Sequence, residues 1–200
     1  MKITEVKGIV KIAYATVDSD LVNWSWNYIN DEIKLKYSKK SAWIYFIVVD
    51  GIIRKVGGTG MAVVDRARFY QSANYWTDKP GYCNAATNPI IFKYLQDNKQ
   101  VTLYSVPEHI KPISVKAIIN GSERTLNVNV DFRPFEKLWR EDIEKFNLEN
   151  NRVDEDLNLD GKSLQITLSN MGLKEVHIRD NKRIPEGKKY IQQGKKWVLV

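Results

Sequence analysis

The chain has 200 residues, of which 43% are hydrophobic, and it carries a formal net charge of +7 with a pI near 9.3. It contains no run of about 18 apolar residues and begins without the apolar stretch of a secretory signal, so we expect no membrane span and a cytoplasmic location. The single cysteine leaves no disulfide partner within the chain, and with only two histidines a Cys/His zinc site is not expected.

The first 40 residues are predicted to be an N-terminal extension of the module that follows. An apolar alternation at 9–15 predicts a strand or short helix, and the aromatic segment at 24–28 predicts a helix. The basic run at 34–40 predicts an exposed linker.

Residues 41–150 have the pattern of an α+β module, with a small central three-stranded antiparallel sheet flanked by helices and with an added β-hairpin. The pairs Asp50-Gly51 and Asn120-Gly121 mark two hairpin turns, and Asn88 is a good N-cap residue for a helix. The glycines from Gly57 onward are expected to end the second strand. The predicted elements are strands at 42–49, 52–57 and 101–106, helices at 63–72, 89–97 and 134–147, a polar loop at 72–87 and the inserted hairpin at 113–131.

The turn at Asp50-Gly51 decides whether Tyr45 and Lys55 can act together. With a two-residue turn, Lys55 would point to the other face of the sheet from Tyr45. With a three-residue turn, in which Gly51 adopts the left-handed conformation of a G1 bulge, the phenol and the amine lie directly opposite each other. We predict the bulged register, because strands that are only structural do not need this polar pair.

On a shared face, the ammonium of Lys55 is expected to lower the pKa of the Tyr45 phenol from about 10, which would make Tyr45 a general base. The alternative is a buried tyrosine beside a lysine that extends to solvent. Arg66 and Tyr70 are four residues apart on the next predicted helix, so they share one face and can bind a phosphate together. Arg68 is expected to point elsewhere.

The 134–147 helix carries a candidate metal ligand. Glu136 lies at the edge of its apolar stripe, where a carboxylate directed into a cleft could hold a magnesium ion. The acidic residues Glu141, Asp142 and Glu144 are expected on the solvated side. The predicted buried stripe consists of Phe135, Leu138, Trp139, Ile143 and Phe146.

Residues 151–200 are predicted to form a basic C-terminal region. Residues 162–200 hold nine Lys or Arg and three acidic residues, which gives +6 of the net +7. Clustered positive charge is typical of a partner rich in phosphate, such as nucleic acid, although a solvated basic tail is the alternative. Short strands are expected at 163–168 and 175–179.

Taken together, these residues resemble the GIY-YIG nuclease superfamily, most closely its type II restriction endonuclease branch. The family's first motif corresponds to Trp43-Ile44-Tyr45, and the second corresponds to Lys55-Val56-Gly57, with lysine where most members have tyrosine. That replacement is known within the restriction branch. The ordered set is specific although no single motif is, and it continues in this chain with Arg66, Tyr70 and Glu136.

Two positions depart from the family pattern or leave it open. Trp43 stands where the family's first motif has its first glycine. The late asparagine of the family corresponds either to Asn147 or to Asn150.

The resemblance implies a site-specific endonuclease that hydrolyses phosphodiester bonds of double-stranded DNA with one divalent metal, Mg²⁺ or Mn²⁺. It implies that Glu136 holds the metal and that Tyr45 is the general base, assisted by Lys55. Arg66 and Tyr70 would orient the phosphate. Because both strands must be cut, the resemblance also implies a homodimer.

Residues outside the catalytic set are candidates for reading the DNA sequence. A nuclease of repair, mobile-element or phage origin and a DNA-binding regulator without cleavage remain the alternative functions. Besides the 113–131 hairpin, the candidate DNA-binding residues are Tyr75, Trp76, Lys182, Arg183, Lys188 and Lys189.

Overall fold

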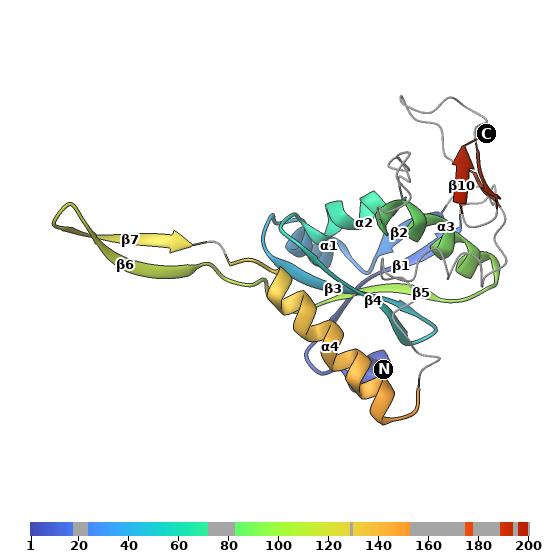
Figure 1. The fold of residues 1–200 in the computed structure, drawn as a ribbon, viewed down its shortest axis with the longest axis horizontal. Coiled ribbons are helices and arrows are strands. Elements are labelled where there is room, and N and C mark those ends of the chain that lie inside the picture. Colours follow the sequence, from blue (N-terminus) through green and yellow to red (C-terminus); the bar gives the residue numbers. More distant parts are fainter. Residues whose placement is uncertain are drawn as a thin grey trace.

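A five-stranded antiparallel sheet with helices on both faces forms the body of the molecule (Figure 1). The computed structural model describes residues 1–17, 24–71, 83–128, 130–152, 175–177, 189–193 and 196–199. The described elements are η1 (Ile3–Glu5), β1 (Val10–Val17), β2 (Trp24–Tyr28), α1 (Asp31–Tyr37), β3 (Trp43–Val49), β4 (Ile52–Thr59), α2 (Val63–Gln71), α3 (Cys83–Gln96), β5 (Val101–Ser105), β6 (Ile113–Ile119), β7 (Ser122–Val128), α4 (Arg133–Glu149), β8 (Glu175–His177), β9 (Lys189–Gln193) and β10 (Lys196–Leu199).

The predicted α+β class is confirmed, and the sheet is larger than the three strands expected. Its strand order is β2-β1-β5-β3-β4, so the predicted central strands are β5, β3 and β4. The first 40 residues add two more strands, because β1 pairs antiparallel with β5 on one side and with β2 on the other. The strand β4 remains at the open edge of the sheet.

The N-terminal elements differ from those predicted. The aromatic segment expected to be helical is the strand β2, in which Trp24 and Trp26 alternate with less buried residues and lie against the core. The basic run expected to be a linker includes the helix α1. That helix begins where the Asn30 side chain accepts a hydrogen bond from the backbone N–H of Ile33 at 2.8 Å, with two acidic residues in its first turn.

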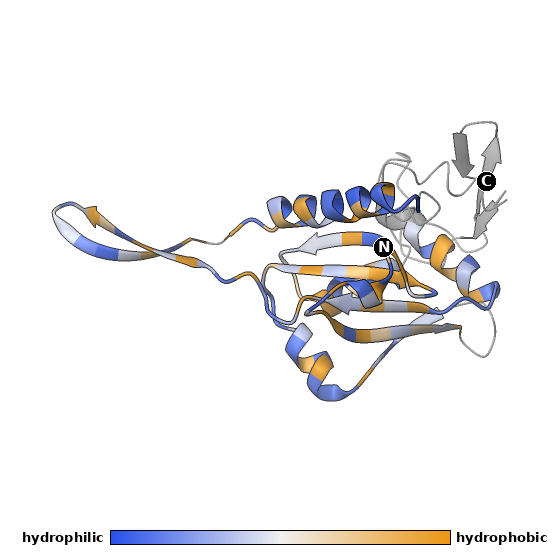
Figure 2. Cartoon of the chain, turned by 90° about the horizontal axis from the view of Figure 1, so that it is seen from below, coloured by the Kyte–Doolittle hydropathy of each residue, from blue (hydrophilic) through white to orange (hydrophobic). Residues whose placement is uncertain are grey.

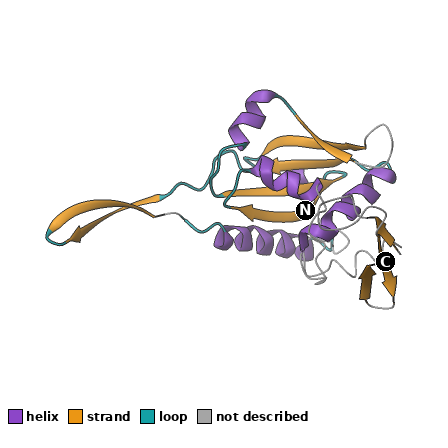
Figure 3. Cartoon of the chain, turned by 90° about the horizontal axis from the view of Figure 1, so that it is seen from above, coloured by secondary structure: helices purple, strands orange, loops and turns teal. Residues whose placement is uncertain are grey.

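The sheet separates two apolar cores. On one face, Tyr45, Ile47 and Val49 of β3 pack under α1, α2 and α3. On the other face, Ile44 and Phe46 pack under α4 (Figure 3). Because side chains alternate along a strand, β3 is fully buried and supplies both cores.

The helix α3 begins at Cys83, earlier than expected, so residues predicted to end the polar loop are helical. Asn88 therefore lies inside the helix instead of capping it. Its side chain accepts a hydrogen bond from the Trp24 indole at 3.1 Å and donates one to the Gln71 carbonyl oxygen at 2.7 Å. Asn88 thus ties α3 to β2 and to the end of α2.

The helix α4 is present as predicted, but only part of its expected apolar stripe is buried. Ile143 is buried and Trp139 and Phe146 are half-buried, whereas Phe135 and Leu138 are exposed. The face of the helix that packs on β4 begins with its N-cap residue. The first two apolar side chains of the helix, Phe135 and Leu138, therefore face outward. None of the described helices has the length and apolar character needed to cross a membrane.

Two smaller antiparallel units complete the described chain. The hairpin of β6 and β7 is present as predicted, with Asn120 and Gly121 at positive φ in its turn, and it extends away from the sheet (Figure 1). The strands β8, β9 and β10 form a separate three-stranded sheet, in which β8 corresponds to the strand expected at 175–179. The strand expected at 163–168 lies outside the described residues.

Candidate active site

Tyr45 and Lys55 share one face of the sheet, although not through the predicted turn. Asp50 and Gly51 both have positive φ (49° and 81°) and form a two-residue turn, so the expected three-residue turn is wrong. Asp50 adopts this conformation while its backbone N–H and side chain bond to Gln100, at 2.9 and 2.8 Å.

The extra residue that changes the register is Arg54, inside β4. Val48 pairs with Ile53 and Ile47 pairs with Lys55, which leaves Arg54 unmatched across the ladder as a β-bulge. Lys55 therefore lies on the same face as Ile47, and so on the same face as Tyr45. The pair is diagonal, since the residue directly opposite Tyr45 is Gly57.

Two consecutive glycines let the candidate site form at the edge strand. β4 continues through Gly57 and Gly58 to Thr59, so the expected end of the strand at Gly57 is wrong. A Cβ atom on Gly57 would lie 2.2 Å from Cζ of Tyr45, because the phenol ring rests on that backbone. On the other face, a Cβ on Gly58 would lie 2.1 Å from Cδ2 of Phe132 and 2.7 Å from Oε2 of Glu136. Side chains at these positions would displace both groups.

Helix α2 brings Arg66 and Tyr70 to the Tyr45 phenol, and the two residues lie on one face of the helix, as their spacing predicts. The Tyr45 and Tyr70 hydroxyls are 2.5 Å apart, and the Nε–H of Arg66 donates to the Tyr45 hydroxyl at 3.3 Å. Lys55 approaches from β4, with Nζ 5.9 Å from the centroid of the Tyr70 ring. Arg68 points elsewhere, as expected: its side chain is 62% exposed and pairs with Asp65.

The electrostatic balance at Tyr45 is the reverse of the one predicted. Burial raises the pKa of Tyr45 above its usual value, and the neighbouring Tyr70 raises it further. Arg66 and Lys55 act in the expected direction and lower the pKa, but their effect is smaller than that of burial. Burial also raises the pKa of Tyr70. In this structure both phenols are therefore protonated at neutral pH.

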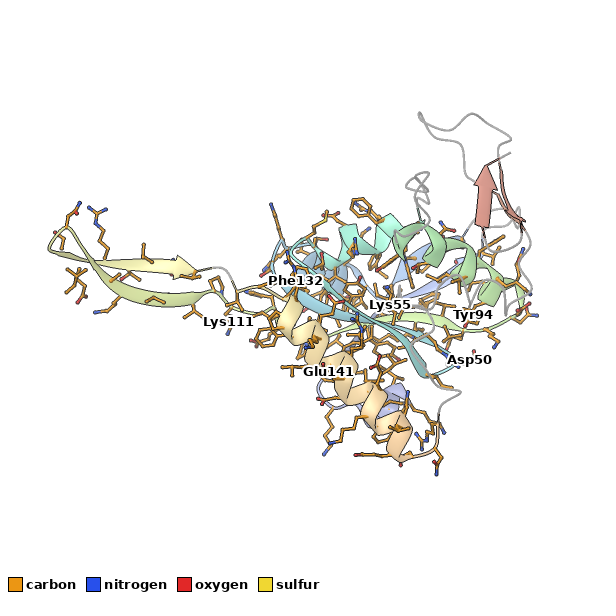
Figure 4. All side chains as sticks on the ribbon, viewed as in Figure 1. Asp50, Lys55, Tyr94, Lys111, Phe132 and Glu141 are labelled. Carbon is orange, nitrogen blue, oxygen red and sulfur yellow. The ribbon has the colours of Figure 1, made fainter. Side chains whose placement is uncertain are left out.

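Glu136 lies in the first turn of α4 and reaches the open edge of β4. Its Oε2 accepts a hydrogen bond from the backbone N–H of Gly58 at 2.9 Å, and its Oε1 accepts one from Arg140 at 2.9 Å. Figure 4 shows Lys55 on the sheet and Phe132 at the start of α4. The carboxylate is close enough to the tyrosine pair to raise the pKa of Tyr70. Among the described residues, Glu136 is thus an acidic group whose charge acts on Tyr70.

The other acidic residues of α4 have the positions expected of a solvated side. Glu141, Asp142 and Glu144 are all exposed, and Glu141 forms a surface ion pair with Lys137 at 3.5 Å. Within the described residues, no group of three or more His, Cys, Asp or Glu side chains is placed to hold a metal ion. Of the acidic residues that the structure describes on α4, Glu136 is the candidate ligand for a metal at this site.

The two candidates for the late asparagine lie away from the tyrosine pair. Asn147 is buried, and its side-chain oxygen accepts a hydrogen bond from the N-terminal ammonium of Met1. It is three turns, or about 16 Å, along α4 from Glu136. The side chain of Asn150 donates to the Phe146 carbonyl oxygen at the end of the helix. In this structure both asparagines serve the helix and the N-terminus.

Sequence reasoning missed two parts of the site, Gly58 and Arg140. The four-residue spacing of Glu136 and Arg140 on one helix was a signal for the ion pair. Gly58 gave no signal beyond being one of several glycines. Of the predicted DNA-binding residues, Tyr75, Trp76, Lys182, Arg183 and Lys188 lie outside the described residues, and Lys189 begins β9.

The comparisons with known proteins find similarity to solved structures only. No family model matches the chain, and no curated protein matches it. A mutant of bacteriophage T4 EndoII is similar at 16% identity and a TM-score of 0.45, covering 70% of this chain and 88% of that one. Restriction endonuclease HPY188I in complex with product DNA is similar at 16% identity and a TM-score of 0.43, covering 73% of this chain and 81% of that one. At these scores the activity of the chain has to be inferred from its own residues.

The buried tyrosines predict a loss of stability in alkali. Burial raises the pKa of Tyr28 and of Tyr37 to about 12, and it also raises the pKa values of Tyr45 and Tyr70. Above pH 10 the unfolded chain loses phenolic protons that the native chain retains, so the contribution of these tyrosines to the free energy of unfolding should be constant below about pH 10 and fall above it.

Urea unfolding at pH 8, 10 and 11 measures this dependence. Each retained proton contributes a slope of about 1.4 kcal/mol per pH unit. Tyr45→Phe should therefore give a shallower fall above pH 10 than the wild type. An identical slope in the variant would show that the Tyr45 phenol ionises in the folded chain as it does in the unfolded one.

Proposed function

We propose that the chain is a metal-dependent endonuclease of the GIY-YIG type that hydrolyses phosphodiester bonds of double-stranded DNA, and that it acts as a site-specific type II restriction enzyme. The observation that carries the proposal is the convergence of side chains from β3, β4, α2 and α4 on one stretch of the edge strand β4. These side chains are Tyr45, Lys55, Arg66, Tyr70 and Glu136.

The proposed substrate is a phosphodiester because the site gathers two cations and two hydroxyl groups beside β4. Arg66 is half-buried, with its guanidinium held beside two phenols, and an arginine fork matches phosphate oxygens. The net charge of +7 favours a polyanionic partner such as DNA. Arg66 and Tyr70 would orient the scissile phosphate and stabilise its negative charge in the transition state.

Glu136 fits the role of a magnesium or manganese ligand. Magnesium commonly binds through one or two carboxylates together with substrate phosphates, so one carboxylate at the edge of a phosphate site is a sufficient protein contribution. The Glu136 side chain is 22% exposed, and Gly58 orients it by a backbone hydrogen bond. When bound, the ion would offset the charge that develops on the phosphate oxygens.

In the proposed reaction, Tyr45 accepts the proton of the attacking water. This role requires the phenolate, which Lys55 and Arg66 favour and burial opposes. The proposal therefore requires that DNA binding admit water to the pair, because hydration removes part of the burial cost. Tyr70, hydrogen-bonded to the Tyr45 oxygen, also raises the pKa of Tyr45, so the proposal requires that this contact change when DNA binds.

Cleavage of both strands requires two sites, and each chain supplies one. A homodimer with a two-fold axis would place one site on each strand, so we include it in the proposal. A non-cleaving DNA-binding regulator is the second candidate. Two observations favour this candidate, the protonated Tyr45 and the pairing of Glu136 with Arg140. In neither state can the group play its proposed part in cleavage.

Incubation of plasmid DNA with the protein and Mg²⁺, resolved on a gel, tests these functions directly. Discrete bands are expected for a site-specific restriction enzyme. A smear or a nicked plasmid would indicate a nuclease of repair, mobile-element or phage type, and an unchanged plasmid would indicate the regulator.

Glu136→Gln is the matched variant for this assay, because its amide oxygen can still accept the Gly58 hydrogen bond. It should reduce cleavage by at least about 10²-fold, the scale of losing one group that stabilises transition-state charge, and leave DNA binding in a gel-shift assay largely intact. Glu144→Gln, at an exposed position of the same helix, should cleave like the wild type. Parallel loss of cleavage and binding in Glu136→Gln would assign Glu136 a structural role.

Arg140 is expected to compete with the metal for Glu136. Its guanidinium pairs with Oε1 of Glu136, so a divalent ion held by this carboxylate would compete with that ion pair. Arg140→Gln should therefore bind Mn²⁺ several-fold more tightly than the wild type in the absence of DNA, as measured by electron paramagnetic resonance of free Mn²⁺. Lys137→Gln removes a cation that pairs with Glu141 instead, and it should leave the affinity unchanged. Weaker binding in Arg140→Gln would mean that Arg140 supports the metal site.

A further inference from the structure

The hairpin of β6 and β7, called the arm below, has one apolar face that the described residues of this chain do not cover. Cross-strand pairing places Ile113 beside Val128 and Val115 beside Leu126 on that face. These four side chains are 58%, 51%, 44% and 43% exposed, respectively. Figure 2 shows the apolar segments along the arm, at a distance from the sheet. A two-stranded ribbon is only marginally stable alone in water, so we expect another surface to cover this apolar face.

The charges of the arm favour a protein surface over DNA as that partner. Lys116 lies on the opposite face and is paired with Glu123 at 2.7 Å. Arg124, beside Ala117 on the apolar face, is then the single cation left over among the charged residues of the two strands. Binding to a DNA groove relies on several cations that neutralise phosphates. The arm was a candidate for base readout, and its apolar face does not suit that role.

A complementary surface lies on the outer side of α4. Phe135 and Leu138 are 40% and 58% exposed, and Asp142 lies four residues beyond Leu138 on the same side of the helix. The apolar pair matches the apolar pairs of the arm, and Asp142 matches Arg124 in charge. The lengths also agree: about 10 Å along the helix from Phe135 to Asp142 and about 13 Å along the arm from Ile113 to Ala117.

The arm of one chain cannot cover its own α4. Figure 1 shows the arm and α4 leaving the sheet in different directions from neighbouring points. We propose that the occupant is a second copy of this chain, with the arm of each copy lying on α4 of the other. Such an exchange is isologous, because each copy gives one arm and receives one. The interface thus consists of two equivalent contacts related by a two-fold axis.

The role of this dimer in cleavage rests on the proposed function. The existence of the dimer does not depend on it. The helix that receives the partner's arm also carries Glu136 in its first turn. Exchange of the arms would therefore fix the spacing of the two Glu136-bearing helices, and with it the distance between the two sites on a duplex.

Sedimentation analysis of the full chain without DNA or metal tests the proposal. The wild type should be a dimer at about 10 µM, and the variants Leu126→Glu and Leu138→Glu should each raise the dissociation constant at least 100-fold. Thr125→Glu, on the opposite face of the arm, is the matched control and should remain dimeric. Far-UV circular dichroism checks that each variant is folded, which is expected because all three positions are exposed.

A charge exchange identifies the two contacting surfaces. Arg124→Glu and Asp142→Arg should each weaken the dimer, and the double variant should recover most of the wild-type affinity. A monomeric wild type, or a dimer unaffected by both Leu126→Glu and Leu138→Glu, would overturn the proposal. Because no cleavage is measured, a dimer that fails to cut DNA would count against the proposed function and not against this interface.

Discussion

The site depends on the close approach of two side chains to the backbone of Gly57 and Gly58. The Tyr45 ring rests on the first glycine from one face of the edge strand, and Glu136 reaches the second from the other. A Cβ atom at either position would occupy the space of a functional group. Because β4 is at the edge of the sheet, the N–H of Gly58 donates to Glu136 instead of to another strand. The two glycines thus allow side chains from the two faces of the sheet to meet in one candidate site.

The same close approach has an electrostatic consequence. Packing the phenol against the strand buries it, and burial raises its pKa more than Arg66 and Lys55 lower it. Glu136 is held in an equivalent resting arrangement, with each oxygen bonded within the protein. If the proposed function holds, the chain without DNA has its groups in place but in protonation and pairing states that precede reaction. On the proposed function, substrate and metal would supply the change, which would limit cleavage to the bound complex.

Local signals in the sequence predicted the elements better than their pairing. The β3–β4 hairpin, α2, α4 and the arm follow from periodicity and turn residues, and the spacing of Arg66 and Tyr70 correctly predicted that both lie on one face of α2. The bulge at Arg54 could not be predicted, because an extra residue in a strand is fixed by packing on both faces and leaves no distinct mark in the sequence. The alternation of Trp24 and Trp26 was a strand signal that the aromatic composition obscured. The Gly58–Glu136 contact joins residues distant in sequence, so it needed the fold.

Tyr45 and Glu136 should act as parts of one site, and a double-mutant cycle on cleavage rates measures this most directly. The rate constants for plasmid cleavage in Mg²⁺ would be compared for wild type, Tyr45→Phe, Glu136→Gln and the double variant. Residues that act as a unit give non-additive losses, so the double variant should be little slower than the slower single variant. Losses that multiply fully in the double variant would contradict a shared site, as would a wild type that leaves the plasmid uncut.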